Sequence, residues 1–140
     1  GGNYFTMWYG VYETSTRTLR YASGGHPPAM AFNTNGDGRW ECTELTGSSS
    51  LPLGMFENAT FETATYTVPA GCRLMVFSDG VFEIPLPDGE HSSIDDLAEA
   101  ALDLLDANEF SADAVADRMR SKSIDGQFDD DCSLVIATFE

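Results

Sequence analysis

Basic residues are scarce in this chain. Only 7 of its 140 residues are Lys or Arg, against 23 Asp and Glu, which gives a formal net charge of −16. A chain this acidic is repelled by the phosphate backbone of nucleic acids and by anionic lipid headgroups. We therefore expect no nucleic acid and no membrane surface among its partners, whereas cations and basic protein surfaces suit its charge.

Cysteine is also rare. The chain has three cysteines, Cys42, Cys72 and Cys132, and they lie far apart in the sequence. Small secreted domains that rely on disulfides carry an even and dense set of cysteines instead. The pattern predicts free thiols and a reducing compartment, the cytoplasm.

Long hydrophobic runs are missing as well. The uninterrupted apolar stretches, such as 74–77, are only a few residues long, which excludes a transmembrane helix and the apolar core of a signal peptide. The chain opens with Gly1 and Gly2 instead of Met, directly before strand-like sequence. We therefore expect a fragment or an excised domain.

What is present is enough for one globular domain. Hydrophobic residues make up 42% of the chain and aromatic residues 11%, and 140 residues can bury a single ordinary core. We see no repeat, low-complexity tract or composition shift, and so we expect one domain over 1–140.

Strand-like segments dominate the first half of the chain, and helices come late. Aromatic and β-branched residues, flanked by turn residues, predict short strands. These segments are 5–12, 18–22, 30–32, 40–45, 61–68, 74–77 and 132–139. Apolar residues at helical spacing predict helices over 94–107 and 112–121, capped by Ser93 and Ser111. The fold class is therefore α+β with a largely antiparallel sheet.

Acidic residues stand at the ends of two strands that are apolar on both faces. Asp79-Gly80 follows 74–77, and three aspartates, 129–131, come just before 132–139. Both strands are expected to be buried, and if they are antiparallel neighbours, the carboxylates meet at one edge of the sheet. A hard divalent cation with oxygen ligands would relieve their repulsion. The alternative is that both are solvated turns, because Asp-Gly is common in turns.

The order of the motifs resembles the SpoIIE-type (stage II sporulation E, RsbU-like) branch of the metal-dependent protein serine/threonine phosphatases, in the PPM superfamily. The resemblance rests on FTMWYGVYETSTRTLRYASGGHPPAM, LPLGMFENATFETATYTVPAGCRLMVFSDGVFE, the helical stretch and DDDCSLVIATF, in that order. Each motif alone is weak, but together they are specific and span residues 5–139.

The resemblance implies an antiparallel β-sandwich flanked by helices, with two Mn²⁺ or Mg²⁺ ions at one edge. A metal-bridged water would attack the phosphorus of a phosphoserine or phosphothreonine without a phosphoenzyme. By position in the motifs, Asp79 and Asp130 would be metal ligands, and Gly80, Asp131 and His26 would support the site. His26 could touch the substrate or a proton path; alternatively, it is a structural hydrogen-bonding group in the rigid GGHPP turn.

One motif of the family has no counterpart here. An early Asp-Gly and a Gly-His-Gly-type helix start normally precede the YGV hairpin, whereas the Gly-Asp-Gly at 36–38 fits a hairpin turn. We therefore expect the chain to hold the C-terminal two-thirds of the phosphatase domain, with weak or no activity by itself.

The resemblance also implies partners. They would be a phosphorylated regulatory protein, such as an anti-sigma-factor antagonist, and a sensory or receiver domain upstream in a bacterial protein. The alternative is a non-catalytic phosphatase-like module that binds a signalling partner. A hydrolase built on Ser78 and His26 is excluded, because Val76 stands where the nucleophile elbow needs glycine.

Overall fold

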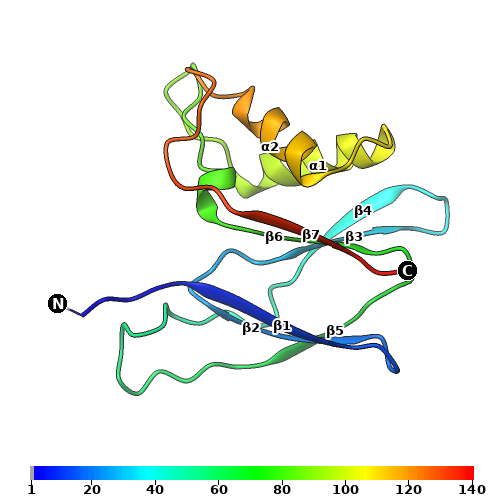
Figure 1. Cartoon of the computed structure of the whole chain (residues 1–140), viewed down its shortest axis with the longest axis vertical. Coiled ribbons are helices and arrows are strands. Elements are labelled where there is room, and N and C mark those ends of the chain that lie inside the picture. The colour runs from blue at the N-terminus through cyan, green and yellow to red at the C-terminus, as the bar shows by residue number, and fades with distance from the viewer. Residues whose placement is uncertain (1) are drawn as a thin grey trace.

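The computed structural model describes residues 2–140, in which two antiparallel sheets pack face to face and two helices cover the outer side of the larger sheet (Figure 1). The smaller sheet has the order β1-β2-β5, with β1 at Met7–Glu13, β2 at Thr18–Gly24 and β5 at Ala64–Thr67. The larger sheet has the order β4-β3-β6-β7, with β3 at Met30–Thr34, β4 at Trp40–Glu44, β6 at Arg73–Phe77 and β7 at Leu134–Thr138. The predicted sandwich is confirmed.

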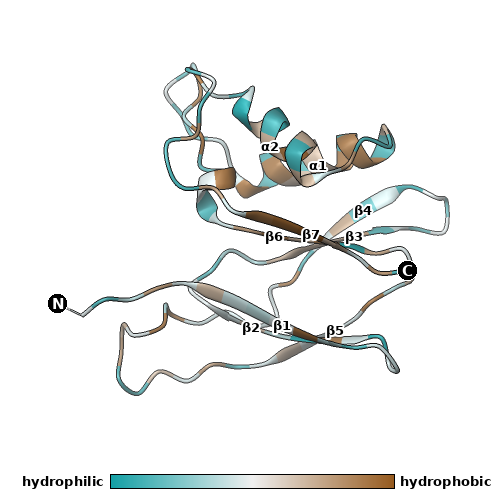
Figure 2. Cartoon of the chain, in the orientation of Figure 1, coloured by the Kyte–Doolittle hydropathy of each residue, from teal (hydrophilic) through white to brown (hydrophobic). Residues whose placement is uncertain are grey.

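Two hydrophobic cores hold these layers together. Along β3, Phe32 packs under the helices while Ala31 faces the smaller sheet, because side chains of a strand alternate between its two faces. In β6, Phe77 likewise packs under the helices, and Leu74 faces the smaller sheet. The strand predicted to be central is therefore central. Figure 2 shows hydrophobic residues along its neighbour β7 and on the helices above the sheet.

The other strand that was expected to be buried, 132–139, is different. Within the described residues 2–140, β7 is an edge strand of the larger sheet, and none of its residues is buried. Leu134 and Ile136 pack toward the helices, but Val135 is 63% exposed. The prediction of a buried strand was therefore wrong, and only one face packs partly against the helices. Apolar composition carries no information on whether a further strand pairs with this one.

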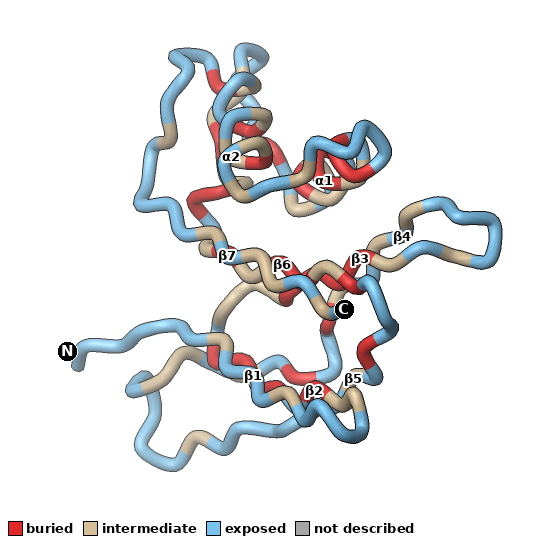
Figure 3. The backbone as a smooth tube through the Cα atoms, turned by 45° about the vertical axis from the view of Figure 1, so that its right-hand side comes forward, coloured by how far each residue is buried: buried red, intermediate tan, exposed pale blue. Residues whose placement is uncertain are grey.

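The strand predicted over 61–68 is also shorter than expected, since β5 is only Ala64–Thr67. The residues before it belong to a long loop from β4 to β5, which Figure 3 shows as mostly exposed. The loop is tied to the start of the chain, because Phe5 and Leu53 exchange backbone hydrogen bonds of 3.1 and 2.8 Å.

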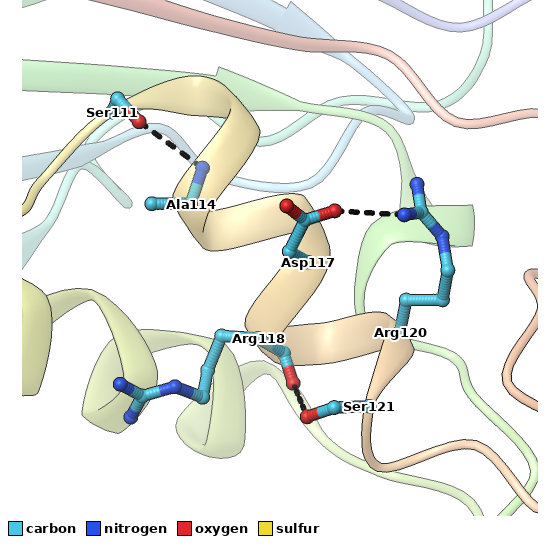
Figure 4. Close-up of polar contacts among 6 residues, drawn as sticks. All are labelled: Ser111, Ala114, Asp117, Arg118, Arg120 and Ser121. Carbon is cyan, nitrogen blue, oxygen red and sulfur yellow. Dashed lines mark hydrogen bonds and ion pairs between the residues drawn. The ribbon is translucent and has the colours of Figure 1, made fainter.

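The two α-helices begin where their caps predicted. α1 spans Ile94–Asp106 behind the N-cap Ser93, and a single 3₁₀ turn that was not predicted, η1, spans Asp79–Val81. α2 spans Ala112–Arg120, and its N-cap Ser111 accepts a hydrogen bond from the Ala114 amide (Figure 4). No helix within residues 2–140 has both the length and the apolar character needed to cross a membrane.

Candidate metal centre

The antiparallel pairing of β6 and β7 brings the two acidic segments to one edge of the sheet. Phe77 of β6 lies opposite Leu134 of β7. The pairing continues one residue further, since the Ser78 amide donates to the Ser133 carbonyl and the Ser133 amide donates to Ser78 Oγ, both at 2.9 Å. Asp79 and the 129–131 segment therefore start from adjacent, hydrogen-bonded positions, as the sequence predicted for neighbouring strands.

Gly80 is where the two segments touch. A Cβ atom at this position would lie 2.3 Å from the backbone oxygen of Asp131 and 3.4 Å from the Cβ of Asp130. Gly80 is buried, and its φ lies outside the left-handed region. The close approach of the other segment, not a turn conformation, is therefore what requires glycine here.

The backbone around the two aspartates is fixed, while the residues themselves are exposed. The Asp79 carbonyl accepts hydrogen bonds from the amides of Phe82 and Glu83 at 3.1 and 2.9 Å, within and just after η1. Asp130 Oδ1 accepts from the Asp131 amide at 2.7 Å, which orients its carboxylate. The pair thus offers carboxylate oxygens to solvent from a rigid base.

These residues fit part of a divalent cation site. Carboxylate oxygens are the donors that Mn²⁺ and Mg²⁺ take, and Asp79 and Asp130 come from segments in direct contact. Within residues 2–140, however, no group of three or more His, Cys, Asp or Glu side chains is arranged to hold a metal ion. A complete coordination sphere would need further oxygen ligands besides these two.

His26 lies at the edge of the same region. Its Nδ1 is 3.2 Å from Thr6 Oγ1, and its carbonyl accepts a hydrogen bond from Ser23 Oγ at 3.0 Å. It also lines a cavity of about 400 Å³ together with Ser78, Asp79 and nearby residues. The structure therefore gives His26 hydrogen bonds within the protein and, at the same time, access to the space beside Asp79.

Sequence reasoning missed what Ser78 does. It considered this serine only as a nucleophile, whereas its hydroxyl accepts from the Ser133 amide and so joins the ends of β6 and β7. The sequence did contain a signal for this role, since Ser78 is a polar residue between a buried strand and Asp-Gly. The contact of Thr6 with His26 had no signal in the sequence, because the two residues lie 20 positions apart, on either side of a complete hairpin.

Comparisons with known proteins agree with this architecture. A family model described as Stage II sporulation protein E (SpoIIE) matches residues 1–140. The phosphoserine phosphatase RsbP of Bacillus subtilis is 29% identical over 108 residues, which cover 71% of this chain and 26% of that protein. Protein IcfG of Synechocystis sp. is 28% identical over 130 residues, 89% of this chain and 19% of that protein. The chain thus spans a small part of either relative.

Two solved structures share the fold. The manganese-presoaked phosphatase domain of SpoIIE from Bacillus subtilis has a TM-score of 0.62 at 18% identity, over 96% of this chain and 56% of that one. A structure of the RsbU and RsbW domains of a Mycobacterium tuberculosis protein has a TM-score of 0.71 at 23% identity, over 96% and 36%. Because the family model covers the full length of the sequence, the chain belongs to the SpoIIE family, as the order of its motifs predicted.

Proposed function

We propose that this chain is part of a metal-dependent phosphatase that removes phosphate from a phosphoserine or phosphothreonine of a regulatory protein. The observation that carries the proposal is the contact between the Asp79-Gly80 turn and the Asp130-Asp131 segment at one edge of the sandwich. Family membership and the similarity to RsbP, a phosphoserine phosphatase, support the same reaction.

In this proposal, Asp79 and Asp130 hold divalent cations. Mn²⁺ or Mg²⁺ ions at such a site supply an activated water and neutralise the phosphoryl oxygens. The chain's own contribution is positional: Ser78 ties the strand ends together, and the absence of a side chain at Gly80 lets the two acidic segments approach. Asp131 contributes the amide that orients the Asp130 carboxylate.

We propose that the 140-residue chain alone has weak or no activity. Two carboxylates do not complete the coordination of the two ions that the reaction requires, and residues 2–140 hold no larger cluster of ligands. In the full-length protein we expect further ligands, a sensory or receiver domain, a cytoplasmic location and a phosphorylated substrate such as an anti-sigma-factor antagonist. The incomplete ligand set also favours a second candidate, a non-catalytic module that binds a signalling partner.

Calorimetric titration of Mn²⁺ into the full-length protein tests the proposal. We expect binding heat in the parent, and its loss in Asp79→Asn and in Asp130→Asn, because an amide is neutral and a poorer ligand for a hard cation. Asp129→Asn is the matched control, since Asp129 is exposed, adjacent in sequence and not a proposed ligand. The same proteins are then assayed for Mn²⁺-dependent hydrolysis of a phosphoserine peptide.

If either substitution, Asp79→Asn or Asp130→Asn, abolishes both the binding heat and the hydrolysis, the phosphatase proposal is supported. Heat without hydrolysis in the full-length protein favours the non-catalytic module. Binding that survives both substitutions excludes this edge as the metal site.

A further inference from the structure

A series of hollows leads away from Asp79 along the surface. The first is the cavity of about 400 Å³ that Asp79 and His26 line. His26 and Pro28 also line a second, smaller hollow of about 100 Å³, and Ser49 is shared between that hollow and a third of about 670 Å³. Because they share these lining residues, the three hollows are neighbours on the surface, and together we call them the acidic groove.

The far end of the acidic groove is built by the loop between β4 and β5. In Figure 1 this loop lies at the same end of the sandwich as η1, which carries Asp79. The third hollow is lined by apolar Leu51 and Phe56, by acidic Glu57 and Glu62, and by smaller polar residues. It therefore combines exposed apolar surface with negative charge.

The groove is held open by hydrogen bonds on both sides. The Gly25 amide donates to the Ser50 carbonyl at 2.6 Å, and Ser48 Oγ donates to the Glu62 carbonyl at 2.6 Å. Ser48 is buried, and its hydroxyl also accepts a hydrogen bond from the Ser23 amide at 3.0 Å. These bonds fix the loop to β2 and to the turn that carries His26, so the groove does not depend on a ligand for its shape.

The charge of the groove selects its occupant. None of the residues that line the three hollows is Lys or Arg, whereas carboxylates stand at both ends: Asp79 and Glu83 line the first hollow, and Glu57 and Glu62 line the third. Carboxylates at both ends of the groove, one pair of them away from the metal edge, repel an acidic chain and attract a basic one. Leu51 and Phe56 add apolar surface, of the kind on which hydrophobic side chains of a peptide pack.

We infer that the acidic groove binds the polypeptide segment flanking the phosphorylated residue of the substrate protein, and that it selects segments with basic and apolar side chains. The inference rests on the proposed function, because it places the phosphoryl group beside Asp79. The flanking segment then runs past His26 and ends on Leu51 and Phe56.

Peptide binding to the full-length protein tests this inference. The probe is a fluorescent peptide with a non-hydrolysable phosphonate in place of phosphoserine, flanked by lysines and a leucine, and its partner has glutamates in place of the lysines. We expect the lysine peptide to bind more tightly in fluorescence anisotropy. Glu57→Lys combined with Glu62→Lys should weaken its binding by about tenfold at low salt and less at high salt.

The control is Glu99→Lys combined with Glu109→Lys, which makes the same change in net charge at exposed positions on and beyond α1. It should leave the preference for lysine peptides intact. Hydrolysis of p-nitrophenyl phosphate by the same proteins is measured in parallel, because this small substrate does not reach the third hollow.

The outcomes separate the two proposals. Hydrolysis of the small substrate with no preference for lysine peptides, or with a preference that survives the Glu57/Glu62 reversal, overturns the groove and leaves the phosphatase standing. A preference that reverses with the Glu57/Glu62 change, without any hydrolysis, supports the groove and counts against the phosphatase.

Discussion

At the scale of single residues, Gly80 is the most constrained position of the proposed site. Its missing side chain leaves room for the Asp131 carbonyl, which belongs to a segment about fifty residues later in the chain. Backbone atoms cannot move aside as a flexible side chain can. The consequence is that the geometry of the two aspartates depends on a residue that carries no chemistry itself.

Gly80→Ala should therefore destabilise the fold and disturb the site together. We expect a loss of about 1–3 kcal/mol in the free energy of unfolding, because the new methyl group overlaps backbone atoms. Urea denaturation measures the loss, and Mn²⁺ titration of the full-length variant reports on Asp79 and Asp130.

Gly36→Ala is the matched control for this substitution. A Cβ atom at Gly36 meets nothing within 4 Å, and the residue lies outside the left-handed region. Its effect should stay within about 0.5 kcal/mol of zero, as for other surface substitutions. Equal stabilities for the two variants would show that the segments do not touch at Gly80.

The three cysteines should differ in reactivity. Cys132, next to the acidic segment, is exposed, Cys72 is buried, and burial, followed by the charge of Glu44, raises the pKa of Cys42 to about 11. Because the thiolate is the nucleophile, Cys42 and Cys72 should be protected near pH 8. Iodoacetamide labelling followed by peptide mass spectrometry should find Cys132 modified first. Prior modification of Cys72 would contradict the packing between the two sheets.

At the scale of elements, the pairing of β6 with β7 makes the site, and the helices above stabilise the sheet that carries it. α1 begins with a reciprocal cap: Ser93 Oγ accepts from the Asp96 amide, and Asp96 Oδ2 accepts from the Ser93 amide at 2.7 Å. The hydrogen bond from the Ser93 amide holds the pKa of Asp96 below its ordinary value. The charged carboxylate is therefore the form that the folded state favours.

Asp96→Ala should cost about 1 kcal/mol of stability at neutral pH, since it removes one half of a capping box. A lowered pKa means that this contribution is present above the unfolded pKa and is lost as pH falls through the folded one. The difference between parent and variant should therefore shrink below about pH 4. Urea denaturation over a pH series measures it.

Asp95→Ala controls for the helix dipole, because Asp95 also lies in the first turn of α1 but takes no part in the capping box. It should have a smaller effect than Asp96→Ala. A difference for Asp96→Ala that did not change with pH would mean that the carboxylate charge is unimportant for the cap.

At the scale of the whole molecule, the two sides of the sandwich differ. The helices cover the larger sheet, whereas the outward side of β1 exposes Met7, Tyr9 and Val11, and Phe5 just before the strand is also exposed. Trp8 and Tyr12, which alternate with them, pack between the sheets. Exposed apolar surface favours association, and the net charge of −16 opposes it.

The 140-residue chain should therefore associate more strongly as salt is added, because salt screens the repulsion between copies. Sedimentation velocity should show a mass that rises with salt. Tyr9→Glu should suppress the rise, since Tyr9 is 60% exposed on the apolar side of β1.

Ile124→Glu makes the same charge change at a residue that is 62% exposed on a separate loop. It should associate like the parent. A parent chain that stays monomeric at every salt concentration would show that the apolar side of β1 does not drive association.

The sequence by itself predicted the fold class and most element boundaries, because alternating and helical patterns depend on local periodicity. It named the two candidate ligands, Asp79 and Asp130, through its resemblance to the motifs of the SpoIIE family. Side-chain period and capping are local properties, so they can be read without knowing which strands become neighbours.

Only the tertiary structure decided that β7 is an edge strand in the described chain, that Gly80 lies against Asp131, and that His26 meets Thr6. It also decided that three neighbouring hollows lie between Asp79 and Phe56. Each of these depends on contacts between residues far apart in the chain. Such contacts are set by how the two sheets and the long loop pack, and no local pattern of residues encodes them.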